Sequence, residues 1–151
     1  MRQTAGTRKS PGEKIVKDIK RATRSGGCAC GALRYEVKNS PFSAVHCHCE
    51  SCRRITGSPM TSYFGVGRAQ VTWNGARRFY NSSLGVTRGF CDLCGTPMHY
   101  MSTYWPGEMH LFAATLDDPT LYQPTAHVHW AERVPWLILD DGLPRFLGRS
   151  T

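Results

Sequence analysis

Apolar and polar residues alternate in several short runs from residue 25 onward, which is the period-two pattern of half-buried β-strands. In one of these runs Leu33, Tyr35 and Val37 fall on the same face. From residue 25 onward, only residues 50–56 suit a helix, of one or two turns. The pattern predicts strands at residues 32–37, 44–49, 60–66, 70–73, 77–80, 85–90, 97–102, 109–114 and 126–130. The sequence therefore predicts a mainly β fold.

Turn signals divide these runs. Asn74-Gly75 is a strong two-residue turn because both residue types tolerate a positive φ, and it predicts a hairpin between residues 70–73 and 77–80. Asp117-Asp118-Pro119 and Asp141-Gly142 mark two further turns near the end of the chain.

Charge separates the chain into a basic N-terminal tail, residues 1–24, and a nearly balanced domain, residues 25–151. The tail holds eight Lys or Arg against two Asp or Glu, a net charge of +6 out of the +8 of the whole chain. A few apolar residues could line a short helix at 13–21, but too few to hold it alone. We interpret the tail as solvated and flexible. The alternatives are an arm for nucleic acid or membrane surfaces, or a targeting peptide.

Composition narrows the functional class of the remaining 127 residues. No run approaches the roughly 20 apolar residues of a membrane helix, and no signal-peptide core precedes the domain. We therefore expect a cytoplasmic protein without membrane contact. The near-neutral domain also argues against a nucleic-acid face, which usually carries clustered Lys and Arg, so that only the tail favours nucleic-acid binding.

The seven cysteines all fall into three clusters. An odd number of cysteines without a secretion signal is not typical of a disulfide framework. Clustered cysteines in a reducing compartment indicate metal binding instead. The clusters are Cys28-Ala29-Cys30, Cys47-His48-Cys49-Glu50-Ser51-Cys52 and Cys91-Asp92-Leu93-Cys94.

Two of these clusters together supply a closed metal site. Cys91-x-x-Cys94 followed by Gly95 is typical of a zinc knuckle, whose tight turn directs backbone N–H groups at the sulfur atoms. Cys28 and Cys30 share one face of an extended segment and can complete a four-thiolate site. Such a site is usually structural because it leaves no coordination position for a substrate. A redox role for Cys91 and Cys94 is the alternative, although no βαβ pattern surrounds them.

The third cluster, Cys47, Cys49 and Cys52, supplies three thiolates and leaves one position open, as catalytic zinc sites do. In an extended segment His46 and His48 point away from the cysteines, so local histidine ligation is only an alternative. A fourth ligand from elsewhere in the chain is a second alternative. The histidines available for that role are His99, His110, His127 and His129.

The three cysteine motifs, in this order and at this spacing, resemble the glutathione-dependent formaldehyde-activating enzyme family. The residues that carry the resemblance are Gly26-Gly27-Cys28-Ala29-Cys30-Gly31-Ala32-Leu33-Arg34-Tyr35, Cys47-His48-Cys49-Glu50-Ser51-Cys52-Arg53-Arg54 with Gly57, and Arg88-Gly89-Phe90-Cys91-Asp92-Leu93-Cys94-Gly95-Thr96. The later residues Leu116-Asp117-Asp118-Pro119, His127, Trp136 and Asp141-Gly142-Leu143-Pro144 are also similar to that family. The resemblance covers about residues 25–147, and the basic tail departs from it.

This resemblance implies a β-tent fold, related to zinc-ribbon-like domains, and two zinc ions per chain. By matching positions it implies a structural zinc on Cys28, Cys30, Cys91 and Cys94, and a catalytic zinc on Cys47, Cys49 and Cys52. It further implies a carbon–sulfur lyase activity that adds glutathione to formaldehyde.

Zinc suits this chemistry, because a free thiol with a pKa near 8.5 is mostly protonated at neutral pH and a metal deprotonates it. Arg53 follows the third cysteine and is a candidate partner for a carboxylate of an anionic thiol. Two other interpretations stay open: a zinc-stabilised binding module, and a thiol carrier without turnover.

Overall fold

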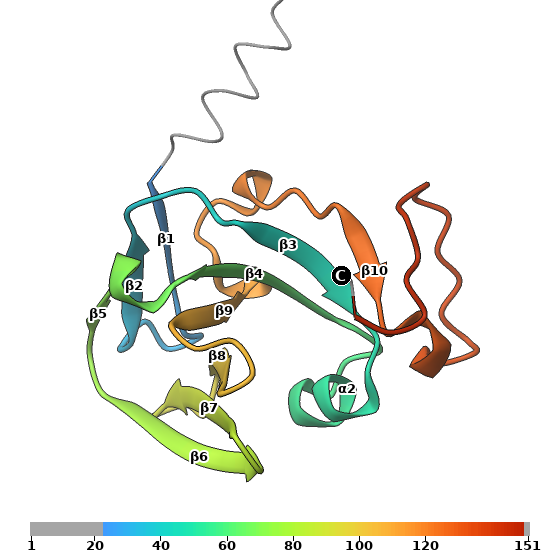
Figure 1. The fold of residues 1–151 in the computed structure, drawn as a ribbon. Helices are drawn as coiled ribbons and strands as arrows, with labels where there is room; N and C mark the ends of the chain where they lie inside the picture. Colours follow the sequence, from blue (N-terminus) through green and yellow to red (C-terminus); the bar gives the residue numbers. More distant parts are fainter. Residues whose placement is uncertain (1–22, 150–151) are drawn as a thin grey trace, which may run out of the picture.

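The computed structural model describes residues 23–149 as two β-sheets joined by loops and short helices (Figure 1). The smaller sheet has three antiparallel strands in the order β1-β2-β5. Its strands are β1 (Arg24–Gly27), β2 (Arg34–Val37) and β5 (Val71–Asn74). The mainly β class predicted from the sequence is confirmed.

The larger sheet has seven strands in the order β10-β3-β4-β9-β8-β7-β6. They are β3 (Ser43–Cys47), β4 (Thr61–Gly67), β6 (Arg77–Ser83), β7 (Val86–Cys91), β8 (Pro97–Ser102), β9 (Glu108–Phe112) and β10 (Ala126–Val128). Neighbouring strands are antiparallel except β10 and β3, which run parallel. The order places β4 beside β9 and β3 beside β10, so segments far apart in the sequence share one surface.

The α-helix α2 (Glu50–Thr56) covers the residues for which the sequence predicts a helix. Cys49 begins it as the N-cap, where its Sγ accepts a hydrogen bond from the Cys52 backbone N–H at 3.3 Å. Gly57 ends it with a φ of 61°, a left-handed conformation that favours glycine. Four 3₁₀ turns complete the described helices: η1 (Arg68–Gln70), η2 (Ala113–Thr115), η3 (Pro119–Leu121) and η4 (Trp130–Glu132).

The hydrophobic core lies between the two sheets. Phe64 and Val66 of β4 and Leu111 of β9 are almost fully buried on one face of the larger sheet. Tyr35 and Val37 of β2, also almost fully buried, belong to the same cluster of contacts. Burial of each such side chain stabilises the fold by about 1.5–3 kcal/mol. Because this face packs against the core, a site on the larger sheet has to lie on its opposite face.

A row of directly opposed residues crosses that opposite face. Ser43 pairs with Gly65, Gly65 with His110, His110 with Tyr100, and Tyr100 with Arg88. Opposed residues on neighbouring strands share a face, as do residues two apart on one strand. The glycine is needed here, since a Cβ at Gly65 would lie 2.5 Å from Ser43 Oγ. One cross-strand row therefore carries a hydroxyl, an imidazole, a phenol and a guanidinium.

The hairpin predicted at Asn74-Gly75 is wrong. β5 pairs with β2 in the smaller sheet, whereas β6 pairs with β7 in the larger one, so this segment crosses between sheets. Gly75 does have a positive φ of 102°, but a Cβ there would lie 2.0 Å from the carbonyl oxygen of Ala32. The glycine is needed for this close approach to the loop before β2, and local turn chemistry alone could not show that.

The predicted basic tail, residues 1–24, lies outside the described residues apart from its last two positions. Arg24 is the buried first residue of β1 and pairs with Val37. Strand pairing is made by backbone groups and does not depend on side-chain charge. The first strand therefore begins at Arg24, one residue before the domain boundary that the charge pattern predicts. No helix within residues 23–149 has the length and the apolar character needed to cross a bilayer.

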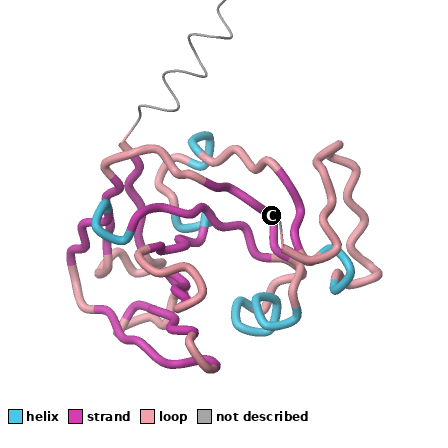
Figure 2. The backbone as a smooth tube through the Cα atoms, in the orientation of Figure 1, coloured by secondary structure: helices cyan, strands magenta, loops and turns pink. Residues whose placement is uncertain are grey.

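The C-terminal segment returns to the outer edge of the larger sheet, beside β10 (Figure 1). The backbone N–H of Phe146 donates to the carbonyl of His127 at 2.9 Å, and the His127 N–H donates to the Pro144 carbonyl at 2.8 Å. Most of the chain after η4 is loop (Figure 2). These bonds hold it in place and deliver Arg149 to the face that carries the cross-strand row.

Candidate functional site

The four cysteines predicted to form a closed site lie together. Their Sγ atoms are all within 4.8 Å of one another, in a group of Cys28, Cys30, Cys91 and Cys94. The sulfurs of Cys28 and Cys30 are 3.4 Å apart, and those of Cys30 and Cys91 are 3.8 Å apart. Tetrahedral zinc with bonds of about 2.3 Å places sulfurs about 3.8 Å apart, so the spacing fits a four-thiolate site.

Local geometry explains how this four-cysteine cluster is held. The Gly95 N–H donates to the Cys91 carbonyl at 3.0 Å, and Gly95 has a φ of 73°, which closes the tight turn of the knuckle. Across the sheets, the Ala29 N–H donates to Thr96 Oγ1 at 3.1 Å. The Leu33 N–H donates to Cys28 Sγ at 3.2 Å. The cluster therefore ties the loop after β1 to the β7–β8 turn.

The second group, Cys47, Cys49 and Cys52, also brings its three Sγ atoms within 4.8 Å of one another. Cys47 ends β3, Cys49 caps α2, and Cys52 lies in the first turn of that helix. No histidine belongs to either cysteine group within the described part of the chain. The structure thus assembles three thiols from a six-residue segment, at a point where strand gives way to helix.

The three thiols cannot all ionise without a cation between them. Hydrogen bonding to Cys49 and Cys52, together with burial, raises the pKa of Cys47. Hydrogen bonds from Cys47 and Cys52 lower the pKa of Cys49. All seven cysteines of the chain are free thiols. A divalent cation removes this mutual repulsion, so the donor set and its spacing both fit a metal.

A cavity of about 160 Å³ opens beside the three-cysteine cluster. It is lined by Cys47, Cys49, Ser51, Cys52, Tyr63, Ser83, Val86, Arg88, Tyr100, Trp105, Phe112, His129 and Arg149. Most of these residues come from the non-core face of the larger sheet. Val45, Ala126 and Val128 belong to the same buried apolar cluster as Cys47.

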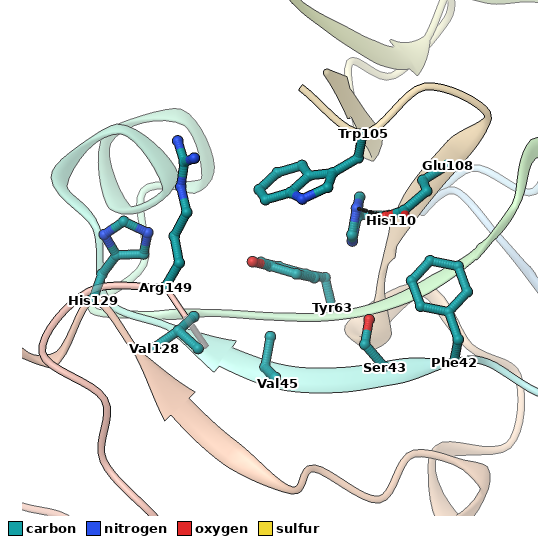
Figure 3. Close-up of a pocket in the computed structure, with 10 residues that line it drawn as sticks. All are labelled: Phe42, Ser43, Val45, Tyr63, Trp105, Glu108, His110, Val128, His129 and Arg149. Atoms are coloured by element: carbon teal, nitrogen blue, oxygen red, sulfur yellow. Dashed lines mark ion pairs between the residues drawn. The ribbon is translucent and has the colours of Figure 1, made fainter. Parts of the chain in front are cut away.

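A second cavity, of about 230 Å³, continues from the first and shares Tyr63, Trp105, His129 and Arg149 with it. Figure 3 shows Tyr63 and Trp105 in the middle, Arg149 and His129 at one side, and Phe42, Glu108 and His110 at the other. We call the two cavities together the groove.

Arg88 is a groove residue to which the sequence analysis assigned no function. Its side chain is almost fully buried, and its guanidinium lies 5.1 Å from the ring centre of Tyr100. Its Nη2 donates to Ser51 Oγ at 3.3 Å and its Nε to Ser82 Oγ at 3.1 Å, while Nη1 has no hydrogen-bond partner. A buried cation with a free donor beside three thiols favours anions in this cavity.

Arg149 and Tyr63 were also missed by sequence reasoning. The Arg149 guanidinium lies over the rings of Tyr104 and Trp105, at 4.5 and 5.1 Å from their centres. Burial raises the pKa of Tyr63, so its hydroxyl stays protonated and can donate a hydrogen bond. Tyr63 lies two residues from Gly65 on β4 and pairs with Phe112, so it shares the face of the polar row. The sequence predicts the strand at residues 60–66 but does not show which of its faces carries a site.

Arg53, the predicted substrate-binding residue, does not line the groove. Its Nε donates to the His48 carbonyl at 3.0 Å and its Nη2 to the Glu132 carbonyl at 3.1 Å. These bonds fasten α2 to the residues just before it and to η4. The structure therefore uses Arg53 to position the helix, and its substrate-binding role stays a prediction.

The histidines near the three cysteines form a separate buried chain behind them. His48 Nε2 lies 2.9 Å from His127 Nδ1, and His127 Nε2 lies 2.8 Å from a carboxylate oxygen of Asp141. His46 instead pairs with Ser62 at 2.7 Å, on the face opposite Cys47. The chain anchors the C-terminal loop to the interior of the protein.

Comparison with solved structures supports the fold. A crystal structure of a Rhodobacter sphaeroides protein matches with a TM-score of 0.54 at 20% identity. The match covers 81% of this chain and 98% of that protein.

Comparison with known sequences identifies the family. The chain is 30% identical over 113 residues to a Halomonas elongata protein that bears the name of a glutathione-dependent formaldehyde-activating enzyme, covering 69% of this chain and 71% of that protein. It is 31% identical over 78 residues to an uncharacterised lyase of Schizosaccharomyces pombe, covering 52% of this chain and 57% of the lyase. The sequence profile of the glutathione-dependent formaldehyde-activating enzyme family matches residues 23–132. With its cysteine motifs in register and most of its length matched, this chain belongs to the glutathione-dependent formaldehyde-activating enzyme family.

Proposed function

We propose that the protein is a zinc-dependent carbon–sulfur lyase that reversibly adds glutathione, or a similar small thiol, to formaldehyde or another small carbonyl compound. In this reaction a bond forms between sulfur and the carbonyl carbon, the thiol loses its proton, and the carbonyl oxygen gains one. The observation that carries the proposal is the cluster of three thiols at the wall of a cavity that also holds two arginines. The family membership supports the choice of thiol and aldehyde.

Two zinc ions per chain are part of this proposal. Cys28, Cys30, Cys91 and Cys94 would hold a structural ion, and Cys47, Cys49 and Cys52 would hold an ion with one position left for substrate. Zinc at the second site would supply a Lewis acid that lowers the pKa of a bound thiol. We assign residues 25–151, as the sequence predicts, to one zinc domain of the β-tent type, and β1 extends this domain to Arg24.

The residues of the groove supply binding and orientation. Arg88 and Arg149 carry positive charge beside the three thiols, where they favour a thiolate or a substrate carboxylate. The protonated Tyr63 hydroxyl can donate to an oxygen that gains negative charge during addition. Trp105 lines both cavities, and in Figure 3 its ring lies beside that of Tyr63 in the middle of the second one, where it adds an apolar wall.

The test is the rate of exchange between free glutathione with formaldehyde and their hemithioacetal. The uncatalysed addition already proceeds, so the end-point yield is uninformative. Exchange spectroscopy by NMR at equilibrium measures the rate directly. Zinc-replete protein should accelerate the exchange, and Cys49→Ser should return it to the buffer rate. Glu36→Gln, an exposed substitution on β2 of the other sheet, is the control and should behave as wild type.

Wild-type protein that leaves the exchange at the buffer rate would remove this substrate pair. A thiol carrier that binds glutathione without turnover would show that result together with measurable binding. Measuring both rate and binding on the same preparation therefore separates the enzyme from the carrier.

A further inference from the structure

The end of the groove farthest from the three cysteines has a different chemistry from the end beside them. We call it the acidic end and define it by Phe42, Ser43, Glu108 and His110. Figure 3 shows these side chains gathered on one side of Tyr63 and Trp105, with Arg149 on the other. The groove therefore runs from a cationic end at the thiols to an end whose charged group is a carboxylate.

The charge of Glu108 is not neutralised by the protein. Within residues 23–149 the one basic side chain within ion-pair distance of Glu108 is His110, whose Nε2 lies 3.3 Å from a carboxylate oxygen. Burial lowers the pKa of His110 to about 4, so that this imidazole is uncharged at neutral pH. About a third of the Glu108 side chain is exposed, and Glu108 is one of the residues that line the groove. A negative charge thus faces the groove without a fixed counter-charge.

His110 adds a second acceptor. Its side chain is more than nine-tenths buried, and both ring nitrogens are shielded from solvent. Nδ1 has no hydrogen-bond partner, and the 3.3 Å approach of Nε2 to Glu108 does not have hydrogen-bond geometry. A neutral imidazole carries one nitrogen lone pair that can accept a hydrogen bond. Buried polar atoms are normally paired, so an imidazole without a hydrogen bond at the wall of the cavity adds a polar group that a ligand there can approach.

Aromatic rings surround this acceptor. The centres of Phe42, Tyr63 and Trp105 lie 6.2, 5.3 and 5.6 Å from the centre of the His110 ring. Aromatic faces attract cations through their ring electrons. The Ser43 hydroxyl lies on the same cross-strand row and lines the same cavity. A carboxylate, an imidazole nitrogen, a hydroxyl and several rings together suit a small organic cation.

We propose that the acidic end binds the ammonium group of the thiol substrate, so that the groove selects thiols of the amino-acid or peptide type that carry a free primary amine. This inference rests on the proposed function, because it takes the thiol end of the ligand to lie at Cys47, Cys49 and Cys52. Arg149 at the opposite side of Trp105 has no ion-pair partner within the described chain and would meet a carboxylate of the same ligand. The pattern of charge therefore matches a zwitterion rather than a purely anionic thiol.

The test compares glutathione with N-acetylglutathione, which keeps the thiol and both carboxylates but converts the ammonium into an uncharged amide. Isothermal titration calorimetry on the zinc-replete full chain, at one pH and one salt concentration, gives both dissociation constants. A charge-assisted hydrogen bond lost at a partly exposed site weakens binding by about tenfold. We expect N-acetylglutathione to bind at least that much more weakly than glutathione.

The variant Glu108→Gln separates charge from shape. It should weaken glutathione binding by about tenfold and leave N-acetylglutathione binding unchanged, since that ligand has no ammonium to lose. Glu108→Asp keeps the charge and should recover part of the glutathione affinity. Glu36→Gln serves as the matched control, and wild-type zinc content and thermal stability in every variant would show that the fold is intact.

The possible results distinguish the ammonium site from the proposed reaction. Equal affinities of wild type for the two thiols, or an equal loss for both in Glu108→Gln, would overturn the ammonium site while leaving the proposed reaction in place. Ammonium-dependent binding without acceleration of the exchange would support the site and overturn the reaction. If neither thiol binds to the zinc-replete protein, both proposals fall.

Discussion

His99 is a polar side chain in the hydrophobic core. Its side chain is fully buried and neither ring nitrogen has a hydrogen-bond partner. It packs against Trp73 and Phe79, and a Cβ at Gly89 would lie only 2.1 Å from its Nε2. Desolvation by burial lowers the pKa of His99 to about 4. The fold therefore holds an uncharged imidazole in its interior.

This burial predicts a pH dependence of stability. Between about pH 6.5 and 4 the unfolded chain binds a proton at His99 that the folded chain does not, so stability is lost as the pH falls through this window. The loss from this residue between pH 7 and pH 5 is roughly 2 kcal/mol. His99→Leu and His99→Gln should both reduce the fall in unfolding free energy by that amount, as measured by urea titration at the two pH values. If the variants lose as much unfolding free energy between pH 7 and pH 5 as wild type does, the lowered pKa of His99 is contradicted. The cysteines contribute equally in wild type and in the variants, so their contribution cancels in this comparison.

Single cysteines should differ in their effect on stability according to the loop that they close. Cys30 and Cys91 are 61 residues apart, and a cross-link over such a loop stabilises by about 4 kcal/mol, against about 2 kcal/mol for the six residues from Cys47 to Cys52. Cys94→Ser should therefore lower the melting temperature markedly more than Cys49→Ser does. Thermal unfolding of the two zinc-replete variants measures this, and equal losses would mean that both sites are structural.

At the scale of elements, α2 is held to the rest of the protein by Glu132 at the end of η4. One carboxylate oxygen of Glu132 accepts a hydrogen bond from the Glu50 N–H at 2.9 Å, at the first turn of the helix. The other pairs with His129 Nδ1 at 2.9 Å, and the Glu132 carbonyl accepts from Arg53. Glu132 thus links the helix that carries Cys52 with a residue that lines the groove.

Removing this link should weaken the second metal site without removing a ligand. Glu132→Ala is expected to lower the zinc affinity of the Cys47, Cys49 and Cys52 cluster by about tenfold, as loss of an outer partner of a metal ligand commonly does. Titration of the zinc-loaded protein with a chelator measures this affinity, from the zinc ion that is released first. The matched control is Glu36→Ala, and the same affinity in both variants would show that α2 holds its place without Glu132.

Local signals in the sequence predict elements better than they predict neighbours. Residues 50–56 are the predicted helix, and most predicted strands appear within one or two residues of their expected bounds. The hairpin predicted at Asn74-Gly75 does not form, because β5 pairs with a strand of the smaller sheet. That pairing depends on tertiary packing, which the turn residues do not show. Likewise the members of each cysteine motif follow from short spacings, whereas Arg88, His110 and Arg149 line one groove only through strand register and the returning C-terminal segment.

At the scale of the whole molecule, the described fold and the basic tail are distinct in charge. Residues 1–24 carry +6 of the net +8, and β1 begins at Arg24. Because the tail has few apolar residues, deleting residues 1–22 should leave thermal stability and zinc content unchanged. It should also lower any salt-sensitive binding to polyanions. Elemental analysis and thermal unfolding of the truncated chain check this, and aggregation or zinc loss would show that the tail packs on the domain.

We propose that one chain holds two unlike thiolate sites, one closed by four cysteines and one open toward the groove. The most direct test is elemental analysis of metal-replete protein, before and after mild chelation. We expect two zinc ions per chain, with the ion at Cys47, Cys49 and Cys52 leaving first, because its fourth position exchanges with solvent, and the other leaving only on unfolding. Cys49→Ser should retain close to one ion per chain under the same treatment. A single zinc ion per chain in the metal-replete wild type would contradict the two-site account.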